Sequence, residues 1–260
     1  MSRTYVMLAK QRSGTRAFGH MIKQHPNVVY LSEVFHKNAQ QGEFGFFNFA
    51  FEEVKRQPEL MYPDRKVEIL DRYLNYYQEK NPSPKRIVLD VKYNQTHHFD
   101  HYIQERWVDM PIFLRRIMSL KIPVIHICRR NCLATYLSVE RAKQSGIWHT
   151  KAGEVQTDTF VVDTDDMVRE INARQQEMDV FSRWLSNYPH VLTLDYEKMY
   201  EDGVPEKGMV EQVSSFLELK NPIVPETDIS RQSTGAYEKE VENWEEVKSA
   251  LIENGLAKFL

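Results

Sequence analysis

The segment 5–22 constrains the fold of this chain more than any other. Residues 5–9 are apolar and β-forming, the next residues form a polar loop with a single glycine, and apolar positions Phe18 and Met21 follow at helical spacing. The pattern predicts a strand, a loop and a helix. Backbone N–H groups at the start of such a helix have no intrahelical partner, and the helix dipole adds partial positive charge, so the junction attracts a phosphate.

Two other interpretations of this loop need to be weighed. Arg12 and Arg16 add formal positive charge and favour phosphate binding. An ATP-binding P-loop requires G-x-x-x-x-G-K-[ST], and no such sequence follows the first strand, so Mg-ATP chemistry is the weaker interpretation. The third possibility is that Ser13, Gly14 and Thr15 only make a turn and cap a helix.

Four further short apolar runs indicate strands, at 28–31, 86–91, 123–128 and 191–195. Segments with helical periodicity separate them. Alternating strands and helices predict an α/β fold that is P-loop-like, with a mostly parallel central sheet of about five strands and helices on both faces. Ligands of such sheets bind at the carboxyl ends of the strands. We expect residues 1–260 to form a single domain.

Composition excludes several classes of protein. The chain is 42% hydrophobic and 27% charged, and its formal net charge of −3 gives no reason to expect nucleic-acid binding. No apolar run approaches the roughly 18 residues that span a bilayer, and the N-terminus does not resemble a signal peptide. Cys128 and Cys132 have no companion pair that would suggest zinc. We therefore expect a cytoplasmic protein with reduced cysteines and no membrane span.

A second polar cluster follows the run at 123–128. Arg130 leaves the end of this predicted strand, and Ser138 lies about two turns into a helix that begins near Asn131. One arginine and one hydroxyl at these positions can hold the same anion from two sides. The alternative is that Arg130 pairs with a surface acid while Ser138 faces water.

Together these segments resemble the sulfotransferase family that uses 3′-phosphoadenosine 5′-phosphosulfate (PAPS). The first part of the chain is similar to Golgi glycan sulfotransferases of the heparan type, and Arg130 and Ser138 have the eight-residue offset of the family's 3′-phosphate motif. The segment 90–96 resembles bacterial trehalose-type enzymes. The matching segments near the N-terminus are R-S-G-T-R-A at 12–17, H-P-N-V-V at 25–29 and S-E-V-F-H at 32–36, and weaker similarities follow at 194–199 and 216–219.

The chain departs from the family pattern in three places. Arg12 replaces the usual lysine, Cys132 replaces a common proline, and the R-K-G loop near the C-terminus is missing. The resemblance implies that a cradle formed by the first loop binds the 5′-phosphate and that Arg130 and Ser138 bind the 3′-phosphate. The cradle residues are Arg12, Ser13, Gly14, Thr15 and Arg16, and the expected substitutes for the missing loop are Arg231, Gln232, Ser233 and Thr234.

The resemblance also implies in-line transfer of a sulfuryl group, with roles for four residues. Glu33 aligns with the catalytic glutamate of the glycan enzymes and is the expected general base, while Arg12 meets the charge on the leaving oxygen. Lys92 belongs to the polar edge after the third strand, where His97 is the main competitor for the role of base. His97, Asp100 and His101 also have a spacing that fits metal ligands, but the transfer requires no metal when arginines and a helix dipole neutralise the charge.

The resemblance to the heparan-type and trehalose-type enzymes favours a carbohydrate or glycolipid hydroxyl as the acceptor. An aromatic pocket wall would equally receive a lipid head group, a phenol or a peptide tyrosine. The aromatic stretch 44–51 suits either core packing or a wall of an acceptor pocket. Two other function classes stay open. One is a nucleotide or small-molecule kinase of the same fold, and the other is a PAPS-binding or PAP-binding module that has lost catalysis.

Overall fold

Five parallel strands form the central sheet of the protein, as the sequence predicts. The computed structural model describes residues 3–36, 45–100, 110–146, 159–201, 203–225 and 237–260. The strand order across the sheet is β2-β3-β1-β4-β5, so the first strand lies in the middle. The strands are β1 (Arg3–Ala9), β2 (Val28–Leu31), β3 (Arg86–Lys92), β4 (Val124–Cys128) and β5 (Val191–Asp195).

The continuous apolar runs become strands because both of their faces are covered. Side chains from Tyr5 to Leu8 have no solvent exposure, and they alternate between the two faces of the sheet. Strand β1 pairs with β3 so that Ala9 lies opposite Lys92, and with β4 so that Ala9 lies opposite Ile127. The three central strands therefore end side by side, and the polar segments that follow them meet at one edge.

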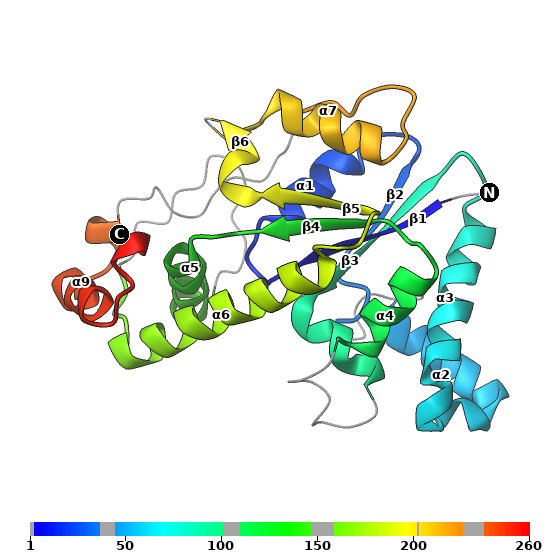
Figure 1. The fold of residues 1–260 in the computed structure, drawn as a ribbon, viewed down its shortest axis with the longest axis horizontal. Coiled ribbons are helices and arrows are strands. Elements are labelled where there is room, and N and C mark those ends of the chain that lie inside the picture. The colour runs from blue at the N-terminus through cyan, green and yellow to red at the C-terminus, as the bar shows by residue number, and fades with distance from the viewer. Residues whose placement is uncertain (1–2, 37–44, 101–109, 147–158, 202, 226–236) are drawn as a thin grey trace.

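Helices cover both faces of the sheet (Figure 1). One face, with Val6 and Leu8, packs against α3, α4 and the second half of α6, while the other, with Tyr5 and Met7, packs against α1 and α7. The expected helices flanking the sheet are thus confirmed. These helices are α1 (Thr15–Ile22), α3 (Lys66–Lys80), α4 (Ile112–Ser119), α6 (Thr164–Leu185) and α7 (Lys207–Phe216).

A third apolar cluster lies where α5, the first half of α6 and α9 meet. Leu133, Ile171 and Val247 are fully buried there, so the C-terminal helix is docked onto the rest of the chain. Cys128 and Cys132 are free thiols in buried positions. The remaining elements are α2 (Phe46–Arg56), α5 (Cys132–Ser145), α8 (Tyr237–Glu240), α9 (Trp244–Glu253) and a small hairpin of β6 (Tyr200–Glu201) and β7 (Val204–Pro205).

The aromatic stretch after β2 divides between core and surface. Phe46, at the start of α2, is buried and packs edge-on against Phe35 and Tyr73. Phe51 on the same helix is 61% exposed. The core-packing interpretation thus holds for Phe46, the acceptor-pocket wall stays a prediction, and Phe44 lies outside the described residues.

In the described part of the chain, no helix has the length and apolar character that crossing a membrane requires.

Candidate functional site

The loop between β1 and α1 is strained and lacks a side-chain cap. Arg12 has a φ of 69° and Gly14 a φ of 74°, both in the left-handed region. Helix α1 begins at Thr15, and Gly14 at its N-cap offers no side-chain hydrogen bond to the first N–H groups. These donors point toward the loop, where an anion can accept from them.

Backbone strain distinguishes two positions at the sheet edge. Among the described residues, four that are not glycine have positive φ: Arg12 at 69°, Glu33 at 40°, Lys121 at 54° and Glu218 at 54°. Lys121 and Glu218 lie one residue beyond the C-caps of α4 and α7, a position where a left-handed residue commonly ends a helix. Arg12 and Glu33 instead follow strands, where no helix end explains the strain. Backbone strain without such an explanation is typical of functional sites.

The side chain of Arg12 reaches helix α5. Its Nε and Nη2 donate to Ser138 Oγ at 3.0 and 2.7 Å. Burial lowers the pKa of Arg12, and the positive charge of Arg129 lowers it further. An arginine remains a cation in spite of such shifts, so the loop carries a partly desolvated positive charge.

Arg130 does not share the environment of Ser138. Its Nε donates to Asp195 Oδ1 at 2.8 Å, and the Arg130 side chain is 63% exposed. The alternative interpretation of the sequence is that Arg130 pairs with a surface acid while Ser138 faces water. Arg130 does pair with an acid, whereas Ser138 Oγ accepts from Arg12. Helix α5 does begin at Cys132, with Asn131 Oδ1 accepting from Ala134 N–H as its cap.

Arg129 and Tyr196, which follow β4 and β5, contact the loop after β1. Arg129 Nη1 donates to the backbone oxygen of Arg12 at 2.7 Å, and its guanidinium lies 4.6 Å from the centre of the Tyr196 ring. A Cβ at Gly14 would come within 2.3 Å of that ring. The close approach and the positive φ together require glycine at this position.

Lys92 is buried below the loop. Its Nζ donates to Asp90 Oδ1 and to Thr15 Oγ1, both at 2.6 Å, and only 1% of Lys92 is exposed. Tyr30 donates its hydroxyl to Asp90 Oδ2 at 2.8 Å. Burial and the neighbouring Asp90 raise the pKa of Tyr30, so its hydroxyl stays protonated. The ammonium of Lys92 therefore lies next to the loop after β1 and is hydrogen-bonded to Asp90 and Thr15.

Glu33 lies at the same edge, just beyond the end of β2. It is half-buried, and the N–H of the next residue, Val34, donates to the backbone oxygen of Asp90 at 3.2 Å. Strand β3 lies between β2 and β1, and the register places Leu31, the last residue of β2, level with Leu89 of β3 and Val6 of β1. Strand β2 therefore ends three residues before the level of Ala9, where β1 ends.

The other predicted residues of the cradle differ in exposure. Ser13 and Thr15 are buried, with 1% and 6% of their surface exposed, whereas Arg16 is exposed on the first turn of α1. Thr15 is the one that contacts Lys92. Arg231, Gln232, Ser233 and Thr234 lie outside the described residues.

His97 is engaged by a neighbouring acid. It lies in a short 3₁₀ helix (Tyr93–Phe99) after β3, and its Nδ1 is 2.6 Å from Asp100 Oδ2. The other oxygen of Asp100 accepts from Ile112 N–H at the start of α4. A cluster of three metal-ligating side chains is not found among the described residues, and His101 lies outside them.

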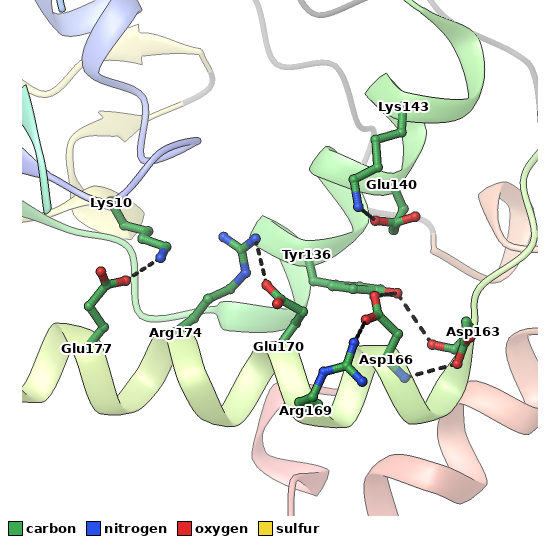
Figure 2. A network of polar contacts seen from close by, with 10 residues as sticks. All are labelled: Lys10, Tyr136, Glu140, Lys143, Asp163, Asp166, Arg169, Glu170, Arg174 and Glu177. Carbon is green, nitrogen blue, oxygen red and sulfur yellow. Dashed lines mark hydrogen bonds and ion pairs between the residues drawn. The ribbon is translucent and has the colours of Figure 1, made fainter. Parts of the chain in front are cut away.

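The start of the loop is tied to helix α6. Lys10 forms an ion pair with Glu177, as Figure 2 shows, while Arg174 on the same helix extends toward Glu170. Tyr136 of α5 donates to Asp166 Oδ2 at 3.2 Å. Helix α6 therefore contacts the loop after β1, through Lys10, and helix α5, through Tyr136.

A cavity of about 430 Å³ lies beside the carboxyl ends of β4 and β5. Its charged residues are balanced, with three cations and three acids. They are Arg130, Lys198 and Lys258, and Asp179, Asp195 and Glu197.

Sequence reasoning missed three partners that the structure reveals: Asp90, Arg129 and Asp195. Asp90 could have been found, because Asp90 and Lys92 are two residues apart in a strand and so share a face. Arg129 and Asp195 offer no such local signal, since their contacts are more than 60 residues away in sequence.

A parallel sheet whose central strand leads through a strained, cationic loop into a helix defines an α/β protein with a P-loop-like fold. Residues 4–245 match the Stf0 sulphotransferase family, and the chain therefore belongs to that family. Among curated proteins, no sequence matches significantly.

Two solved structures are similar to the chain in fold. A sulfotransferase from Alicyclobacillus acidocaldarius has a TM-score of 0.48 and 12% identity, over 99% of this chain and 95% of that one. Mouse sulfotransferase SULT7A1, complexed with PAP, has a TM-score of 0.44 and 14% identity, over 84% of this chain. The matched region spans 59% of the mouse protein's length.

Proposed function

We propose that this protein transfers a sulfuryl group from PAPS to a hydroxyl group of an acceptor, with Glu33 as the general base. The observation that carries the proposal is the strain at Arg12 and Glu33. These two residues follow β1 and β2, the strands on either side of β3, and neither positive φ is explained by the end of a helix. Family membership and the cationic loop support the same reaction.

The donor's two phosphates would bind different elements. The N–H groups at the start of α1, with Arg12, Ser13, Gly14, Thr15 and Arg16, would cradle the 5′-phosphate. Arg130 and Ser138 would hold the 3′-phosphate. This requires Arg130 to exchange Asp195 for the ligand, and Ser138, whose Oγ accepts from Arg12, to donate its hydroxyl hydrogen to the same phosphate. Arg231, Gln232, Ser233 and Thr234 are proposed to complete this end of the site.

In the reaction, the acceptor oxygen attacks sulfur while the bond from sulfur to the bridging oxygen breaks. Glu33 accepts the proton of the acceptor hydroxyl. Arg12 neutralises the negative charge that develops on the leaving oxygen, with Lys92 adding positive charge from below the loop. Because these cations and the helix dipole supply the charge, we propose that the transfer requires no metal.

The acceptor is proposed to be a carbohydrate or a glycolipid. This assignment rests on the similarity of 12–36 to glycan sulfotransferases and of 90–96 to trehalose-type enzymes. The exposed ring of Phe51 on α2 offers a surface on which a sugar can stack. We further propose a cytoplasmic location, in keeping with the two free thiols.

Thermal shift separates this proposal from the kinase and the inactive module. A ligand that binds the native state alone raises the unfolding temperature, so adenosine 3′,5′-bisphosphate (PAP) should stabilise the protein more than ATP or AMP. A kinase would instead prefer ATP. An inactive module would bind PAP and transfer no sulfuryl group from radiolabelled PAPS to any sugar, glycolipid or phenol tested.

The role of Glu33 is tested by Glu33→Gln, which keeps the shape of the side chain but cannot accept a proton. We expect kcat to fall by roughly 10² or more, while PAP affinity remains near that of the wild type. His97→Ala should reduce kcat much less, and Glu245→Gln on the exposed face of α9 serves as a matched control. If Glu33→Gln is nearly silent and His97→Ala inactive, the base is His97.

A further inference from the structure

The phosphate loop adopts a conformation that its own sequence does not favour. The left-handed conformation of Arg12 is unfavourable relative to ordinary backbone, since its Cβ crowds the following carbonyl. Such strain persists only where surrounding contacts fix the conformation. The residues that fix it here come from outside the loop.

Arg129, directly after β4, holds the backbone oxygen of Arg12 at 2.7 Å. That oxygen belongs to the same planar peptide unit as the N–H of Ser13, and in a trans peptide the two groups point in opposite directions. A donor that fixes the oxygen on one side therefore fixes the N–H on the other. The N–H of Ser13 is one of the proposed donors to the 5′-phosphate.

Tyr196, directly after β5, fixes Arg129 in turn. The Arg129 guanidinium is 4.6 Å from the centre of the Tyr196 ring, a distance at which a cation is attracted to the ring face. The same ring lies so close to Gly14 that a Cβ there would be 2.3 Å from it. Arg129 and Tyr196 thus contact the loop at both of its left-handed residues.

We propose that Arg129 is a positioning residue which, stacked on Tyr196, orients the Arg12–Ser13 peptide and so forms the 5′-phosphate site before the donor binds. The proposal rests on the proposed function and assigns separate tasks to two adjacent arginines. Arg129 acts on the 5′-phosphate through the backbone, whereas Arg130 is proposed to contact the 3′-phosphate itself. A preformed site binds more tightly because less chain is ordered on binding.

Three nucleotides distinguish these tasks. PAP carries both phosphates, AMP only the 5′-phosphate, and adenosine 3′-monophosphate only the 3′-phosphate. For Arg129→Ala we expect the affinities for PAP and AMP to fall by the same factor, about tenfold, as for loss of one hydrogen bond from a charged group. Affinity for adenosine 3′-monophosphate should be unchanged, and Arg115→Ala, exposed on α4, is the control.

Arg129→Lys separates position from charge. Lysine keeps the charge but has a single ammonium in place of the planar fork that bonds the carbonyl and stacks on the ring. We therefore expect Arg129→Lys to remain several-fold weaker than the wild type for PAP and AMP. Affinities are measured by titration calorimetry at a temperature where circular dichroism shows every variant to be folded. A loss of stability then does not appear as a loss of affinity.

The proposal is overturned by any of three results: an unchanged affinity in Arg129→Ala, a loss confined to nucleotides with a 3′-phosphate, or wild-type affinity in Arg129→Lys. The second result would make Arg129 a direct 3′-phosphate ligand, and the third would make its charge sufficient. Failure of the wild-type protein to bind PAP would instead contradict the proposed function.

Discussion

Two ion pairs at the same edge of the sheet have similar geometry but opposite environments. Lys92 Nζ and Asp90 Oδ1 are 2.6 Å apart, with each side chain 2% exposed. Arg130 Nε and Asp195 Oδ1 are 2.8 Å apart, but their side chains are 63% and 26% exposed. The distances do not distinguish the pairs, whereas access to water does.

Access to water determines which of the two ion pairs a ligand can displace. Leaving one member of a buried pair without its partner costs several kcal/mol, since water cannot replace the lost charge. An exposed pair contributes about 0–1 kcal/mol and is readily replaced by another ion. Lys92 is therefore fixed next to the loop after β1, whereas Arg130 can exchange Asp195 for another anion, such as the proposed 3′-phosphate.

The largest effect is expected for Lys92→Met, which leaves the carboxylate of Asp90 buried without its cation. The free energy of unfolding should fall by about 3–5 kcal/mol, as measured by chemical denaturation. Lys55→Met is the matched control, because Lys55 pairs with Glu52 where both side chains are 56% exposed. Its cost should be below about 1 kcal/mol. A cost equally small for Lys92→Met would remove the distinction between the pairs.

A smaller and different effect is expected for Arg130→Ala. Stability should change little, but the affinity for PAP should fall by about 10- to 100-fold, as for loss of a charge-assisted contact to phosphate. The affinity for AMP, which lacks the 3′-phosphate, should stay the same in titration calorimetry. Equal losses for both nucleotides would show that Arg130 does not recognise the 3′-phosphate.

The smallest effect is expected for Asp195→Asn, which weakens the competing partner of Arg130. We expect PAP to bind about two- to fivefold more tightly, in line with the modest strength of an exposed ion pair. The same titration measures it, with AMP as the reference. Weaker binding of PAP would mean that Asp195 positions Arg130 for the ligand instead of competing with it.

The sequence predicted the sheet and the start of the site well, because both are local. Continuous apolar runs mark strands covered on both faces, and the expected one-glycine loop lies at 10–14, between β1 and α1. Helix α5 begins at Cys132 with Asn131 as its cap, which confirms the helix start expected near Asn131. The single domain and the roles assigned to Glu33, Lys92 and His97 stay predictions.

The contacts between side chains could not be predicted, because they join distant segments. Arg12 bonds Ser138 across 126 positions, and Arg130 selects Asp195, which lies 65 positions away. No sequence pattern predicts either contact, since a cation at a strand end can reach several acids and hydroxyls. The burial of Lys92 likewise depends on Asp90 and Thr15 being brought together by β3 and α1.

The central place of β1 has a consequence for how the protein uses binding energy. This strand is paired on both sides, with β3 and with β4, so the phosphate loop extends from the part of the sheet that opens least. A donor bound at this loop, as proposed, would have little chain to order. Its interactions with the loop would therefore be available to stabilise the transition state instead of being offset by folding of the site around the ligand.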